Sequence, residues 1–133
     1  MLSILLVEDH LLFAGVIVRL LKKVEDIEEV AVAKTAEIAL QELDAHKFDL
    51  LLVDVSLPQM NGIRLVSVVH DQYPDLPCLM LSGHALPHYV RRALDAGARG
   101  YILKDSSLAI TEGIRHVLSG EIYVSPELRD HVI

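Results

Sequence analysis

Residues 50–62 read Leu50-Leu-Leu-Val-Asp-Val-Ser-Leu-Pro-Gln-Met-Asn-Gly62, a short aliphatic run that ends in an aspartate and passes into a loop. The run Leu50–Val53 shows no alternation of apolar and polar side chains. Such runs are typical of parallel strands that are covered on both faces. The segment therefore predicts a buried central strand with Asp54 at its carboxyl end.

Four further segments have the same aliphatic character, and stretches with helical spacing lie between them. In one such stretch Ala36, Ala39, Leu40 and Leu43 recur at the period of an amphipathic helix. Five strand–helix units predict one α/β domain, a flavodoxin-like (βα)5 doubly wound parallel sheet with strand order 2-1-3-4-5. The other strands are expected at Ser3–Val7, Glu29–Ala33, Cys78–Leu81 and Gly100–Leu103.

Residues at the expected element ends fit this arrangement. Thr35 can cap the helix after the second strand, and Pro87 fits the first turn of the helix after the fourth. Gly97 and Gly120 fit the carboxyl ends of two helices. We expect residues 1–124 to form the domain. Residues 125–133 are expected to be a last turn or the start of a linker, with any output domain absent from this chain.

Composition argues against several classes of protein. The 133 residues are 52% apolar and carry a formal charge of −7, which argues against direct nucleic-acid binding, because lysine and arginine hold phosphate backbones. No apolar run approaches the roughly 18 residues of a membrane span. The first residues also lack the basic segment of a signal peptide. We therefore expect a cytoplasmic protein with no membrane partner, in which Cys78 is a buried core thiol.

Polar residues follow the apolar runs where the strands are expected to end. Glu8 and Asp9 follow the first run, Asp54 the third, Ser82 the fourth and Lys104 the fifth. In open α/β sheets, ligands bind at the carboxyl edge, where the strand order reverses. With the order 2-1-3-4-5, the first and third strands are neighbours. We therefore expect one acidic pocket, flanked by a hydroxyl group and an ammonium group.

Three carboxylates in one pocket need compensation. Two unit charges about 5 Å apart repel by roughly 3 kcal/mol at an effective dielectric constant near 20. Either a pKa rises or a cation binds. An all-oxygen site with few protein ligands suits Mg²⁺ or Mn²⁺ better than zinc. Taken singly, each of these residues is more simply a helix cap, a turn residue or a surface charge, but their joint occurrence at four strand ends favours a site.

Four segments together resemble the response-regulator receiver domains of two-component signalling, and the resemblance covers essentially the whole chain. The later segments 100–105 and 120–126 are similar to the NarL/FixJ-type branch, whose members usually carry a helix-turn-helix output domain. The four segments are Leu5–His10, Leu52–Gly62, Met80–His84 and Ala96–Asp105.

The resemblance implies a phosphoacceptor function rather than a turnover enzyme. Asp54 would take a phosphoryl group from a sensor histidine kinase, and Mg²⁺ would be held by Glu8, Asp9, Asp54 and the backbone carbonyl of Ser56. Lys104 would pair with the phosphoryl oxygens.

The same resemblance implies a conformational switch. Ser82 would donate its hydroxyl to the phosphoryl group and move inward. Tyr101 would report the change on the face formed by strand 100–103 and the helices on either side of it. Phosphorylation would then promote a homodimer and control an output, with DNA reached only through the missing helix-turn-helix domain.

Several alternatives stay open from the sequence. Phosphatases of the haloacid-dehalogenase type also use an aspartyl nucleophile, but they place a second aspartate two residues later, where this chain has Ser56. A receiver-like module that never takes phosphate is the other rival. His10 is expected to cap a helix, to line the pocket or to lie on the surface. His84 and Ser56 stand at positions that can tune the lifetime of the phosphoryl group, and the chain is either truncated or a stand-alone regulator.

Overall fold

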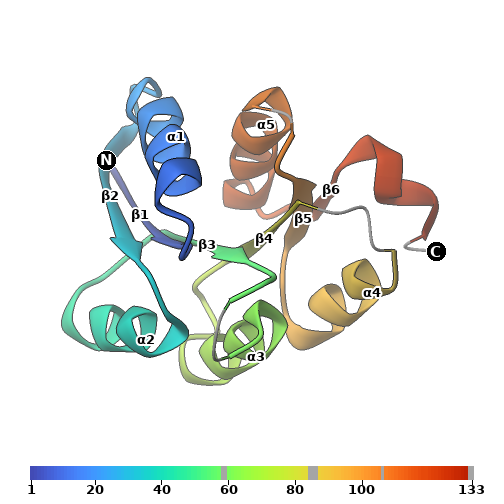
Figure 1. Ribbon diagram of the computed structural model, residues 1–133, viewed down its shortest axis with the longest axis horizontal. Coiled ribbons are helices and arrows are strands. Elements are labelled where there is room, and N and C mark those ends of the chain that lie inside the picture. Colours follow the sequence, from blue (N-terminus) through green and yellow to red (C-terminus); the bar gives the residue numbers. More distant parts are fainter. Residues whose placement is uncertain (58–59, 84–86, 106, 132–133) are drawn as a thin grey trace.

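The computed structural model describes residues 1–57, 60–83, 87–105 and 107–131. These residues form a parallel sheet with helices on both of its faces (Figure 1). The elements in chain order are β1 (Leu2–Val7), α1 (Leu11–Lys22), β2 (Ile27–Ala33), α2 (Ala36–Ala45), β3 (Leu50–Asp54), α3 (Gly62–Gln72), β4 (Cys78–Ser82), α4 (Pro87–Ala96), β5 (Gly100–Leu103), α5 (Ser107–Leu118), β6 (Tyr123–Val124) and a 3-10 helix, η1 (Pro126–His131).

The strand order is β2-β1-β3-β4-β5-β6, and every neighbouring pair is parallel. The predicted order of the first five strands is confirmed. Helices α1 and α5 cover one face of the sheet, and α2, α3 and α4 cover the other (Figure 1). Alternate residues of the strands point into two separate cores, so Leu5 and Val7 pack on the α2–α4 side while Ile4 and Leu6 pack on the α1 and α5 side. Burial on both faces explains the unbroken aliphatic runs.

The predicted helix boundaries are confirmed at several positions. The Thr35 hydroxyl caps α2 by accepting a hydrogen bond from the Ile38 backbone N–H at 3.1 Å. Helix α4 begins at Pro87. Gly97 and Gly120 have φ angles of +117° and +90°, which explains glycine after two of the helices. Strand β2 begins two residues earlier than predicted, and β3 and β4 extend one residue further, to Asp54 and Ser82.

The sequence did not predict β6, because two residues are too few to form a recognisable apolar run. Tyr123 donates its backbone N–H to the Arg99 carbonyl, and Ser125 donates its backbone N–H to the Tyr101 carbonyl, which extends the sheet beyond β5. The buried Ser125 hydroxyl also accepts a hydrogen bond from the Leu103 N–H at 3.0 Å. Helix η1 occupies Pro126–His131, within the stretch expected to be a last turn or the start of a linker.

Helix η1 contributes to the core. Leu128 is 1% exposed and belongs to the apolar cluster under α2, α3 and α4. The neighbouring Arg129 donates from Nε to the Val124 carbonyl at 2.9 Å, and its guanidinium lies over the Tyr123 ring. Cys78 is also buried, as predicted, and burial raises the pKa of its thiol to about 12, so it behaves as a core residue.

We predict that Leu128→Ala lowers the free energy of unfolding by about 2–5 kcal/mol, as expected for a truncated core leucine. Urea denaturation followed by circular dichroism measures this change. Ile122→Ala is the control, because Ile122 is 61% exposed in the segment just before β6. Equal stability of Leu128→Ala and wild type would show that η1 adds nothing to the fold.

Candidate functional site

The acidic residues predicted from the strand ends lie together in the structure. Strands β1 and β3 are neighbours in register, with Val7 beside Val53, so the next residues leave the sheet at the same edge. Glu8, Asp9 and Asp54 each place a carboxylate oxygen within 4.8 Å of the others. Glu8 and Asp54 are buried, whereas Asp9 is exposed to solvent. Among the described residues, no other group of acidic, histidine or cysteine side chains is arranged in this way.

Lys104 closes the cluster from the end of β5. Its Nζ lies 2.7 Å from Glu8 Oε1 and 3.2 Å from Asp54 Oδ1. The same Nζ lies 4.4 Å from the centroid of the Phe13 ring on α1, which shields one side of the ammonium group from water. One ammonium group against three carboxylates leaves two negative charges uncompensated. One divalent cation would balance them.

Backbone groups fix the two buried carboxylates. The His10 N–H donates to Glu8 Oε2 at 3.2 Å, and the Ser56 N–H donates to Asp54 Oδ1 at 3.3 Å. Burial raises the pKa of Glu8, and the hydrogen bond from Lys104 partly opposes this rise. Burial therefore makes the ionised form of Glu8 less favourable, and a bound cation would offset this free-energy cost.

The donor set fits a small hard cation. All side-chain donors are carboxylate oxygens, the ligands that Mg²⁺ and Mn²⁺ prefer, and no sulfur or imidazole ligand takes part. The exposed side of Asp9 leaves room for water, which Mg²⁺ usually retains. Glu8, Asp9 and Asp54 would hold the ion, while a contribution from the Ser56 backbone carbonyl stays a prediction.

Ser82 and Tyr101 continue the site along the sheet edge. Ser82 ends β4 and pairs with Leu103. Tyr101 pairs with Met80, two residues before Ser82 on β4 and further from the carboxyl edge of the sheet. Ser82 is 4% exposed and Tyr101 is fully buried. No described residue meets the Tyr101 hydroxyl with good hydrogen-bond geometry, and the Ser82 side chain lies nearby. Burial raises the pKa of Tyr101, and the nearby Ser82 side chain partly opposes the rise.

Gly62 is a residue whose role the sequence did not reveal. A Cβ atom at this position would lie 2.2 Å from the backbone oxygen of Asp54, far inside van der Waals contact. The Gly62 N–H donates to the Val55 carbonyl at 3.0 Å, and the preceding Asn61 caps α3. Glycine therefore lets the start of α3 close onto the backbone that carries Asp54. The Asn61-Gly62 pair was the available signal in the sequence. The Asp54 backbone atoms that Gly62 approaches can be identified only from the structure.

Of the two histidines considered for the pocket, the structure describes one. His10 is the N-cap of α1, and its Nδ1 accepts a hydrogen bond from the Phe13 N–H at 3.2 Å. The capping expectation is therefore confirmed. His84 lies outside the described residues, so its influence on the phosphoryl group stays a prediction.

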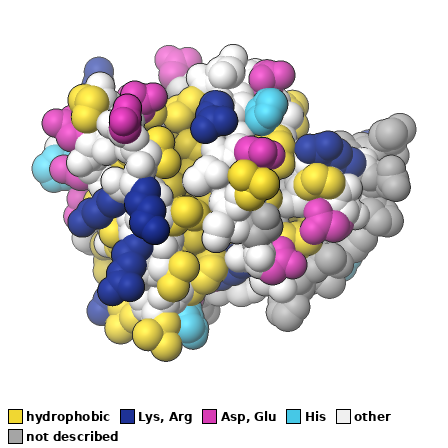
Figure 2. All heavy atoms as spheres, turned by 90° about the horizontal axis from the view of Figure 1, so that it is seen from above, with side chains coloured by type: hydrophobic (Ala, Val, Ile, Leu, Met, Phe, Trp, Pro, Cys, Tyr) yellow, Lys and Arg dark blue, Asp and Glu magenta, His cyan; other side chains and the backbone are white. Residues whose placement is uncertain are grey.

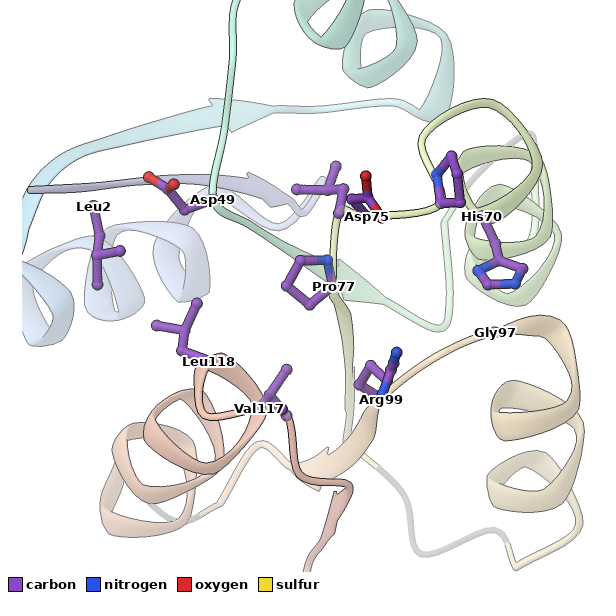
Figure 3. A pocket seen from close by; sticks show the side chains of 12 residues that line it. Leu2, Asp49, His70, Asp75, Pro77, Gly97, Arg99, Val117 and Leu118 are labelled. Carbon is purple, nitrogen blue, oxygen red and sulfur yellow. The ribbon is translucent and has the colours of Figure 1, made fainter.

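A separate cavity of about 510 Å³ lies at the opposite edge of the sheet (Figure 3). Asp49, His70, Asp75 and Arg99 are spread around it and do not converge on one point (Figure 3). Asp49 already accepts a hydrogen bond from the Ser3 N–H at 2.8 Å. The charged side chains that converge on one point therefore lie at the carboxyl edge, in the cluster formed by Glu8, Asp9, Asp54 and Lys104.

Two curated relatives, a transcriptional regulatory protein and a response regulator, are longer than this chain. The chain is 31% identical over 132 residues to the transcriptional regulatory protein DegU of Brevibacillus brevis, which covers 98% of this chain and 56% of DegU. It is 30% identical over 129 residues to the response regulator GacA of Pseudomonas syringae, with coverage of 96% and 60%. The chain thus spans a little over half the length of these relatives.

Solved structures with the same fold point to the same branch. A LuxR-family two-component response regulator from Aurantimonas superimposes with a TM-score of 0.94 at 25% identity, covering 99% of this chain and 95% of that one. The receiver domain of the response regulator NarL from Mycobacterium tuberculosis gives a TM-score of 0.84 at 30% identity, with coverage of 90% and 98%. Residues 4–114 match the response regulator receiver domain family. The chain therefore belongs to this family, as its sequence motifs predicted.

Proposed function

We propose that this receiver domain takes a phosphoryl group on Asp54 from a phosphohistidine of a sensor histidine kinase, in a Mg²⁺- or Mn²⁺-dependent reaction in the cytoplasm. The observation that supports this most directly is the carboxylate of Asp54, 3.2 Å from the Lys104 ammonium and clustered with two further acids. The reaction would occur once per phosphorylation cycle, so the chain is not proposed to be a turnover enzyme.

The proposed step is an in-line transfer. An Asp54 carboxylate oxygen forms a bond to phosphorus as the bond from phosphorus to the imidazole nitrogen breaks, and the electron pair stays on the leaving imidazole. The product is an acyl phosphate. A bound divalent cation would supply charge neutralisation between the carboxylate and the incoming phosphoryl oxygens.

The residues around Asp54 are suited to this step. The Ser56 N–H already holds Asp54 Oδ1, which leaves the other carboxylate oxygen to attack. Lys104 is a compact positive charge that can move from Asp54 Oδ1 to a phosphoryl oxygen while it keeps Glu8 as its partner. Ser82, at the end of the neighbouring strand, is proposed to donate its hydroxyl to a second phosphoryl oxygen.

The proposed output follows from the same geometry. Ser82 and Tyr101 lie on β4 and β5, so a movement of the hydroxyl toward the phosphoryl group changes the space beside the Tyr101 ring. The face formed by α4, β5 and α5 would then alter its contacts and favour a homodimer. Control of transcription through a helix-turn-helix domain outside this chain is proposed by analogy with relatives such as the transcriptional regulatory protein DegU.

The haloacid-dehalogenase alternative has no support at the site. Its general acid would stand two residues after the nucleophile, where Ser56 has a hydroxyl and an exposed side chain. In a module that never takes phosphate, nothing would compensate for burying Glu8 beside Asp54, although burial raises the pKa of Glu8. The phosphoacceptor proposal accounts for both residues.

We predict that acetyl phosphate with Mg²⁺ adds one phosphoryl group to the wild-type chain, measured by intact mass. Asp54→Asn should gain none, because the amide is not a nucleophile. Asp71→Asn, at an exposed position on α3, is the matched control and should be labelled like wild type. A chelator should prevent labelling of both wild type and Asp71→Asn. Labelling of Asp54→Asn to the wild-type extent would reject Asp54 as the acceptor.

We predict that Glu8→Gln stabilises the metal-free protein at pH 7 but removes its response to Mg²⁺. Because burial raises the pKa of Glu8, the folded state holds a proton there more tightly than the unfolded chain does. Wild-type stability should therefore rise as pH falls through that raised pKa, and the variant should lack this rise.

Thermal melts with a chelator and with Mg²⁺ measure both effects. At a hundred times the dissociation constant, Mg²⁺ should stabilise wild type by about 2.7 kcal/mol. Glu28→Gln, at an exposed position on β2, serves as the control. A Glu8→Gln variant that melts below wild type in the chelator would contradict the prediction.

We predict that Gly62→Ala loses most phosphorylation and about 1–3 kcal/mol of stability, because its Cβ forces the start of α3 away from the Asp54 backbone. Gly15→Ala makes the same change in α1, where the added Cβ meets nothing within 4 Å. This control should be labelled like wild type. The acetyl phosphate assay and urea denaturation measure the two variants, and normal labelling of Gly62→Ala would show that the close approach is dispensable.

A further inference from the structure

Lys104 differs from every other basic residue of the chain in its surroundings. All other lysine and arginine residues are exposed, and Figure 2 shows groups of them on the surface of the face that holds α1 and α5. The Lys104 side chain is only 19% exposed. Its Nζ lies near Glu8 and Asp54 and 4.4 Å from the centroid of the Phe13 ring. The ammonium group therefore lies between two carboxylates and the face of one aromatic ring.

The first turn of α1 fixes the position of Phe13. The N-cap residue of this helix is His10, whose Nδ1 accepts a hydrogen bond from the Phe13 N–H at 3.2 Å. The His10 N–H donates to Glu8 Oε2 at 3.2 Å, while Glu8 Oε1 lies 2.7 Å from Lys104 Nζ. Phe13 is also half-buried against the core on the α1 and α5 side of the sheet. These contacts form a closed cycle, in which Phe13 joins the N-cap of α1 to Lys104.

An aromatic ring restrains an ammonium group without neutralising its charge. The ring quadrupole attracts a cation above the ring face, and the attraction strengthens where water is excluded. During the proposed reaction Lys104 exchanges Asp54 for a phosphoryl oxygen, so one of its two carboxylate contacts is lost. The contact with the Phe13 ring can persist through this exchange, because a ring face does not require a single direction of the N–H bonds. Another carboxylate in the same place would instead cancel the positive charge that the phosphoryl oxygens need.

The stem of Lys104 explains why such a restraint matters. A lysine carries its charge on a flexible four-carbon stem. The stem passes Gly83, where an added Cβ would lie 4.0 Å from Lys104 Cδ, so this neighbour has no side chain to hold it. Phosphoryl transfer depends mainly on the positions of charged groups, and a small displacement of one of them lowers the rate steeply.

We propose that Phe13 is a positioning residue whose ring holds the Lys104 ammonium group where it meets the incoming phosphoryl group, and that His10 supports it by fixing the first turn of α1. This inference rests on the proposed phosphoacceptor function and adds to it two residues that act through Lys104. Their effect is on the rate at which Asp54 is phosphorylated when Mg²⁺ is saturating.

The initial rate of labelling by acetyl phosphate at saturating Mg²⁺ tests this role. Phe13→Leu keeps an apolar side chain but removes the ring, and it should slow labelling about three- to thirtyfold. Phe13→Tyr keeps the ring and should restore most of the rate. Phe48, the other phenylalanine of the chain, is also half-buried but precedes β3, at the opposite edge of the sheet from Asp54. Phe48→Leu is therefore the matched control and should be labelled at the wild-type rate.

Fluorinated phenylalanines separate the charge of the ring from its shape. Site-specific replacement of Phe13 by analogues with one, two and three fluorine atoms weakens the negative potential of the ring face stepwise, while the volume changes little. The logarithm of the labelling rate should fall stepwise along this series. The same series at Phe48 should leave the rate unchanged, and urea denaturation confirms that each variant is folded.

Two variants of His10 test the support from the N-cap. His10→Ala removes the acceptor of the Phe13 N–H and should slow labelling, whereas His10→Asn keeps a capping oxygen and should restore most of the rate. Because both residues act through the same contact, Phe13→Leu should add little to the effect of His10→Ala. Fully additive effects of the two substitutions would overturn the role assigned to His10.

Two results would overturn the role assigned to Phe13. One is a Phe13→Leu variant that is labelled at the wild-type rate. The other is a fluorine series at Phe13 that leaves the rate unchanged. Both results leave the phosphoacceptor function intact, because wild type is labelled in each case. A wild-type chain that acetyl phosphate and Mg²⁺ do not label would instead contradict the phosphoacceptor function, and the role of Phe13 with it.

Discussion

Repulsion among Glu8, Asp9 and Asp54 is the constraint around which this domain is organised. The parallel order brings β1 and β3 side by side, so their acidic ends share one edge of the sheet. Lys104 reaches Glu8 and Asp54 from β5, two strands away from β3 in the sheet. The cluster therefore joins residues about 50 positions apart along the chain. A change in its charge acts on the ends of β1, β3 and β5 together.

The backbone around Asp54 is as specialised as the side chains. The Ser56 N–H holds one carboxylate oxygen, and Gly62 lets α3 begin against the Asp54 carbonyl. Both contacts come from the loop that follows β3, so the nucleophile, its orienting donor and the start of a helix form one continuous unit. This unit is compact because the residue at the closest approach has no side chain.

The sequence predicted the features that depend on local pattern and on strand order. Buried parallel strands give unbroken aliphatic runs, and the residue after each run marks the functional edge, so Glu8, Asp54 and Lys104 could be placed together. It did not predict β6, which is held by backbone pairing with β5 rather than by a run of its own. The role of Gly62 was also hidden, because the atom it must avoid belongs to a residue eight positions earlier.

The buried Tyr101 hydroxyl has an energetic consequence. No group in the described part of the chain meets it with good hydrogen-bond geometry, although the Ser82 side chain lies nearby, and a buried polar group in this condition lowers stability. A phenylalanine side chain at this position would fill nearly the same volume without the penalty. The hydroxyl therefore adds little to the stability of this conformation, and a rearrangement that gives it a hydrogen-bond partner would be favoured by that bond.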